Sequence, residues 1–124
     1  MTDHLLWCRN RRILSVRCSW PADAVEMCER LEREHPGWLV SWMRANDIPG
    51  WELPAGYCAT RDDVSLPRGD EMRRLPEDGV WRRPAVFGPT VGVLRERIAS
   101  MQARIEEREA AAERFWRRMH TGLI

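Results

Sequence analysis

The chain has 124 residues, a length that favours one domain with one modest hydrophobic core. Its 20 basic and 19 acidic side chains leave a net charge of +1, so the charge of the whole chain does not favour nucleic-acid or membrane binding. All the basic residues are arginine, a bias that we attribute first to the codon usage of a high-G+C genome and second to guanidinium recognition.

The N-terminal region has no basic segment followed by an apolar one, as a signal peptide requires. No apolar run approaches the roughly 18 residues of a membrane span. We therefore expect a cytoplasmic protein without a membrane partner. The four cysteines include no CxxC pair, and in that compartment we expect them to stay reduced.

The first expected element is a β-hairpin over residues 4–20. An apolar run at 5–8 is followed by the polar turn 9–12, and residues 13–20 then alternate between apolar and polar side chains. One face of this second strand, predicted to be half-buried, carries Leu14, Val16, Cys18 and Trp20.

A helix is expected to begin at Pro21, because a missing N–H costs nothing at the first helical position. Its apolar residues recur at helical spacing, and the residues 35–37, His-Pro-Gly, predict its end.

The period then changes to two from Trp38 to Met43, which predicts a strand, and residues 57–61 predict its partner after a turn-rich connection. Two hairpins separated by one helix give a ββαββ order, packed as a small antiparallel sheet with the helix across one face. We assign residues 1–64 to this α+β domain. Residues 65–89, rich in Pro and Gly, are predicted to be a linker draped over it.

The last predicted element is a long helix over residues 90–119, with Thr90 as its N-cap. Its apolar residues step by three and four, as in the seam of a coiled coil: Val91, Leu94, Ile98, Met101, Ile105, Ala112, Phe115 and Met119. A helix of this length would reach about 45 Å, more than the domain can cover. We therefore predict a partner-binding interface made by Leu94, Ile98, Met101, Ile105, Arg108 and Phe115.

Arg108 interrupts this seam, where a charge costs stability and often fixes register. Two interpretations stay open: a partner's Glu satisfies it, or the helix turns its stripe away from the core at that point.

The chain has seven tryptophans, and we expect most of them in the core. Trp51 is the exception. It lies in a turn-rich connection, where an indole either plugs the loop or anchors a partner, and we include it among the interface candidates.

The first hairpin also carries four arginines that could contact phosphates: Arg9, Arg11, Arg12 and Arg17. A two-stranded ribbon can enter a major groove, so a small DNA-associated regulator is an alternative function. Against it, residues 1–64 carry 8 Arg and 10 acidic groups, so no positive field supports the patch.

Metal or thiol chemistry is the third hypothesis. His4 and Cys8 form an HxxxC pair, with Cys18, Cys28 and His35 further along the chain, but no second tight pair completes a zinc-finger pattern. A cysteine nucleophile such as Cys28 or Cys58 would need His4 or His35 as its base. The simpler interpretation is that these thiols are small core residues.

We therefore expect an α+β protein with a long C-terminal coiled-coil helix. Its function is predicted to be non-enzymatic: an adaptor that pairs with itself or with a helical partner and needs no catalytic residue, metal or cofactor.

Overall fold

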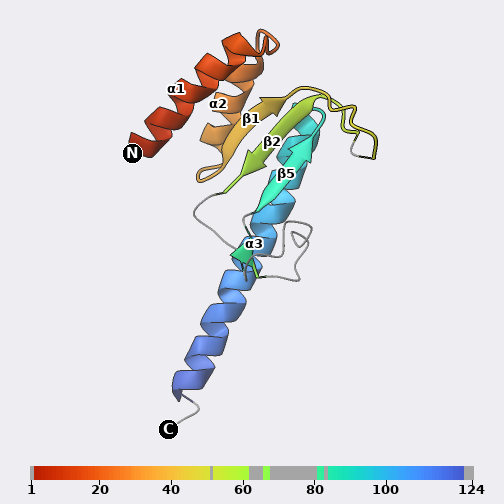
Figure 1. Ribbon diagram of the computed structural model, residues 1–124. Coiled ribbons are helices and arrows are strands. Elements are labelled where there is room, and N and C mark those ends of the chain that lie inside the picture. The colour runs from red at the N-terminus through yellow and green to blue at the C-terminus, as the bar shows by residue number, and fades with distance from the viewer. Residues whose placement is uncertain (1, 51, 62–65, 68–80, 83, 122–124) are drawn as a thin grey trace.

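The computed structural model describes residues 2–50, 52–61, 66–67, 81–82 and 84–121 (Figure 1). These form three helices and five strands in the order α1 (Thr2–Arg17), α2 (Ala24–Glu34), β1 (Leu39–Met43), β2 (Gly56–Thr60), β3 (Leu66–Pro67), β4 (Trp81–Arg82), β5 (Ala85–Gly88) and α3 (Val91–Thr121). The predicted α+β class is confirmed. None of the helices described combines the length and the apolar character that crossing a membrane demands.

The main sheet has three antiparallel strands in the order β1-β2-β5, so β1 is an outer strand. Val40 pairs with Ala59, which pairs with Val86, and these three residues share one face. The short strands β3 and β4 pair with each other in a separate two-stranded sheet.

Helices α2 and α3 lie on the same face of the main sheet (Figure 1). One hydrophobic core joins them to β1 and β2, and its buried residues are Ala24, Cys28, Leu31, Trp38, Val40, Tyr57, Ala59, Leu94, Ile98, Met101 and Ile105. The result is a two-layer domain built around one core.

Polar contacts also join the two helices and the sheet. Arg95 Nε donates to Glu34 Oε1 over 2.9 Å, and this hydrogen bond holds the pKa of the Glu34 carboxyl below its ordinary value. The indole Nε1 of Trp38 donates to Gln102 Oε1 over 2.9 Å, which ties the start of β1 to α3.

Helix α1 replaces the hairpin predicted over residues 4–20, so that prediction is wrong. The segment 2–17 contains neither Gly nor Pro, and nothing in it stops a helix. The helix ends at Arg17 and is closed by Ser19, whose φ of 51° is left-handed, and Trp20 N–H donates to Ser15 O over 3.0 Å in a Schellman-type closure.

The order ββαββ is therefore corrected to ααββ with a third main-sheet strand, β5. This strand lies inside the predicted linker, at residues 85–88. Most of the remaining linker prediction falls outside the described residues.

The other predicted elements are confirmed within a few residues. Helix α2 begins at Ala24 rather than at Pro21, and its C-cap His35 is followed by Gly37 with a φ of 92°. The strands predicted at 38–43 and 57–61 form the expected antiparallel pair. Thr90 Oγ1 accepts the Val93 N–H over 3.2 Å, which confirms it as the N-cap of α3.

Candidate functional site

The most buried polar arrangement in the described residues joins α1, α2 and β1. Arg11 Nη1 donates to Glu32 Oε2 over 2.6 Å, and the two side chains are 1% and 7% exposed. The same oxygen accepts Trp7 Nε1 and the Val40 N–H, each over 2.9 Å. Arg11 Nη1 also donates to Val40 O over 2.8 Å, so one ion pair satisfies both backbone groups of Val40.

Helix α1 packs on the domain through its polar side. Arg11 lies in the buried ion pair, and Arg12 Nη2 donates to Glu29 Oε2 over 2.9 Å nearer the surface. Its large aliphatic residues point to solvent instead, with exposed fractions from 44% to 81%: Leu5, Leu6, Ile13, Leu14 and Val16. Polar contacts, rather than an apolar stripe, therefore hold α1 in place.

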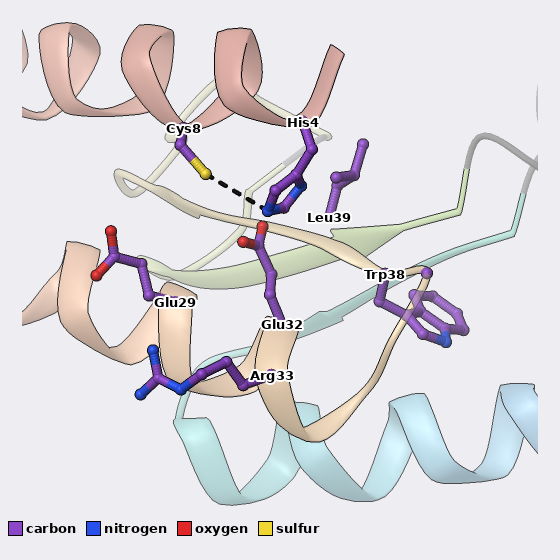
Figure 2. Close-up of a pocket in the computed structure, with 8 residues that line it drawn as sticks. His4, Cys8, Glu29, Glu32, Arg33, Trp38 and Leu39 are labelled. Carbon is purple, nitrogen blue, oxygen red and sulfur yellow. Dashed lines mark hydrogen bonds between the residues drawn. The ribbon is translucent and has the colours of Figure 1, made fainter. Parts of the chain in front are cut away.

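A cavity of about 340 Å³ opens between α1, α2 and the start of β1 (Figure 2). His4 and Cys8 line it from α1, and Figure 2 shows the Glu32 carboxylate directed toward them from α2. Cys8 Sγ lies 3.6 Å from His4 Nε2. One ligand atom from each of the three residues lies within 4.8 Å of the other two.

The arginines predicted to contact nucleic acid do not form one surface. Arg11 is buried in its ion pair with Glu32, and Arg12 pairs with Glu29, while Arg9 and Arg17 are exposed. The β-ribbon on which that hypothesis was built is a helix.

The predicted interface residues of α3 are buried up to Ile105 and exposed beyond it. Four of the six predicted interface residues in α3 are buried against the chain's own sheet and α2: Leu94, Ile98, Met101 and Ile105. Arg108 and Phe115 are exposed, the latter to 57%. Trp51 lies outside the described residues.

Beyond Ile105 the helix extends past the main sheet (Figure 1). We call residues 106–121 the α3 tip. All of its residues are exposed except the half-buried Ala110, and its largest apolar side chains, Phe115, Trp116 and Met119, are 57%, 61% and 47% exposed.

Charge on the α3 tip is divided into two halves. Residues 106–113 contain four Glu and one Arg, whereas residues 114–121 contain three Arg and no acidic residue. Some of these charges pair along the helix: Arg117 Nη2 lies 2.6 Å from Glu113 Oε1, and Arg114 Nη2 lies 3.4 Å from Glu107 Oε1.

The thiols occupy different environments. Burial raises the pKa of the Cys28 thiol from 9.0 to about 12, which makes it a poor nucleophile at neutral pH. Cys58 is half-buried, with its Sγ 3.4 Å from Ser41 Oγ. His35 belongs neither to the Arg11–Glu32 network nor to the group of His4, Cys8 and Glu32. Its Nε2 is buried without a hydrogen bond, 4.0 Å from Glu34 Oε1.

Sequence reasoning identified the His4–Cys8 pair but not Glu32, which is 24 positions from Cys8 and joins it only through the packing of α1 on α2. Comparison with protein-family models, with curated proteins and with solved structures finds no match for this chain.

Proposed function

We propose that the protein is a non-enzymatic interaction module that self-associates through the α3 tip. The observation that carries the proposal is the change of environment along α3: its seam is buried from Leu94 to Ile105 and exposed at Ala112, Phe115 and Met119. Most helical stability in proteins comes from packing of an apolar face, and the 16 residues of the tip are almost all exposed, so a partner for its apolar stripe would stabilise it.

The division of charge favours a second copy of this chain as that partner. In an antiparallel pair of tips, the acidic half of one helix would lie alongside the basic half of the other. A parallel pair would place like charges together, which is unfavourable. Antiparallel pairing also gives both copies the same contacts, as a two-fold symmetric dimer requires.

The sizes of the seam residues agree with this arrangement. When the symmetry axis passes between Glu113 and Arg114, Ala112 of one tip lies opposite Phe115 of the other, so a small residue faces a large one. Arg108 then lies opposite Met119, near the end of the overlap, where its guanidinium can reach water while its stem covers the thioether.

The proposal keeps the localisation expected from the sequence, the cytoplasm, with which four free thiols are compatible. An adaptor built in this way would hold two domains at opposite ends of a short helical pair, each presenting the exposed apolar side of α1.

Sedimentation equilibrium of the full chain over a range of concentrations tests the proposal. We expect a monomer–dimer equilibrium that Phe115→Glu plus Met119→Glu abolishes, because both charges would enter the seam. Val16→Glu on α1, at the most exposed large apolar residue, is the matched control and should leave the dimer intact. A wild-type chain that stays monomeric at every concentration, or a dimer unchanged by the double substitution, would exclude this interface.

A further inference from the structure

The cavity between α1 and α2 carries the donor set of a metal site. His4 and Cys8 are one helical turn apart, so their side chains project from the same side of α1. Zinc bonds of about 2.3 Å to sulfur and 2.0–2.1 Å to nitrogen, meeting at a tetrahedral angle, separate the two donor atoms by roughly 3.5 Å. Cys8 Sγ and His4 Nε2 are 3.6 Å apart, so one ion can bind both with little movement.

Glu32 brings an oxygen donor from α2, and its orientation is fixed before any ion arrives. Trp7, Arg11 and the Val40 N–H all donate to Oε2, and among the described residues no hydrogen bond reaches Oε1. Outer contacts of this kind hold a metal-ligating carboxylate in place. The carboxylate therefore has one oxygen committed to the protein and one oxygen for a ligand.

Charge and ligand type select the class of ion. A Cys8 thiolate and a Glu32 carboxylate, offset by the Arg11 guanidinium, leave one net negative charge beside a neutral His4 ring. Sulfur and imidazole donors suit Zn²⁺ and its neighbours among the transition metals, whereas Ca²⁺ and Mg²⁺ prefer oxygen ligands. Arg11 Nη2, 3.7 Å from Cys8 Sγ, offsets part of the attraction, so we expect weaker binding than at a site with several thiolates.

We infer that His4, Cys8 and Glu32 bind one divalent transition-metal ion of the zinc class. The three ligands come from two helices, so the ion joins α1 to α2 where α1 otherwise relies on polar contacts. Three protein ligands leave a fourth position, which faces the cavity of about 340 Å³ and can take water or a small exogenous ligand.

Titration of the reduced, chelator-treated full chain with Co²⁺ tests this site. Tetrahedral Co²⁺ bound to a thiolate has intense visible bands and a sulfur charge-transfer band, and we expect both to saturate at one equivalent and to disappear when Zn²⁺ is added. Zn²⁺ should also raise the unfolding temperature, because it binds only the folded arrangement.

Cys8→Ser and His4→Ala should each weaken binding at least tenfold and remove the Zn²⁺-dependent rise in unfolding temperature. His4 is exposed, so its replacement leaves the fold intact, and circular dichroism verifies this for both variants. Cys58→Ser, which removes a half-buried thiol outside the cavity, is the matched control and should bind as the wild type does. Absence of the cobalt bands in the wild type, or their persistence in Cys8→Ser, would overturn the assignment.

Discussion

Arg11 and Glu32 form a buried ion pair whose closest atoms, Nη1 and Oε2, are 2.6 Å apart. Removing one member leaves the other as an uncompensated charge in the interior, which costs more than the pair itself contributes. We expect Arg11→Met to lower the free energy of unfolding by about 3–5 kcal/mol, measured by urea denaturation.

Arg12→Ala provides the comparison, since Arg12 pairs with Glu29 at the surface, where the two side chains are 67% and 28% exposed. Its loss should cost less than about 1 kcal/mol. Equal effects of the two substitutions would contradict the difference in burial.

Two glycines near the start of α3 should respond in opposite ways to alanine. A Cβ at Gly88 would lie 2.5 Å from the backbone N of Leu94, so β5 or α3 must move, and we expect a loss of about 1–3 kcal/mol. A Cβ at Gly92 meets nothing within 4 Å, and alanine there should add roughly 0.5–1 kcal/mol through helix propensity. Thermal unfolding of the two variants measures the change in stability caused by each substitution. Destabilisation by Gly92→Ala would contradict the open surroundings of Gly92.

The buried thiol of Cys28 makes stability depend on pH in the alkaline range. Its pKa is about 12 in the folded chain and 9.0 ordinarily, so the folded state keeps the proton that the unfolded state releases. The contribution is fully present below pH 9.0 and is lost as the pH rises toward 12, at about 1.4 kcal/mol per pH unit. Burial also raises the pKa of Tyr57, which adds a loss of the same sign.

Urea denaturation at a series of alkaline pH values measures this slope. Cys28→Ala removes the thiol and should leave only the shallower dependence due to Tyr57 and the other groups. A slope that Cys28→Ala does not change would contradict the assignment.

The separation of acidic and basic residues along the α3 tip predicts how two charge-reversal variants will associate. Replacing Glu106, Glu107, Glu109 and Glu113 with Arg makes the charged residues of the tip uniformly basic, and replacing Arg114, Arg117 and Arg118 with Glu leaves Arg108 as its one Arg. Neither variant should dimerise alone, because like charges would face each other. An equimolar mixture should form a heterodimer that weakens with salt, as light scattering can show. Failure of the mixture to associate would argue against charge-directed pairing.

Periodicity revealed the elements whose buried side is apolar. Trp38 and Val40 alternate with half-buried residues, and the step from Leu94 to Ile98 has helical spacing, so β1 and α3 could be predicted from one-dimensional patterns. The same reasoning failed at α1, where the buried side carries Arg11 and the aliphatic residues Leu14 and Val16 face water. Their alternation with polar residues resembled that of a strand, but in α1 the alternating apolar residues are not buried.

The remaining differences are tertiary in origin. Strand β5 has four residues between Pro84 and Pro89, too few to establish a period, and only pairing with β2 defines it. The His4–Cys8 spacing was visible in the sequence, but on an extended strand the two residues would lie about 13 Å apart. Only the helix brings them together, and only the packing of α2 adds Glu32.

The way in which Val40 is satisfied also limits how this protein can aggregate. An outer strand with unpaired N–H and C=O groups is a template for intermolecular β-pairing and for cross-β fibres. At Val40 both groups are already bonded, to Glu32 and Arg11, and an incoming strand would have to displace both side chains of this buried ion pair. Strand addition at β1 is therefore opposed at Val40, the second residue of the strand, and an Arg11 variant should form amyloid-like deposits more readily than the wild type.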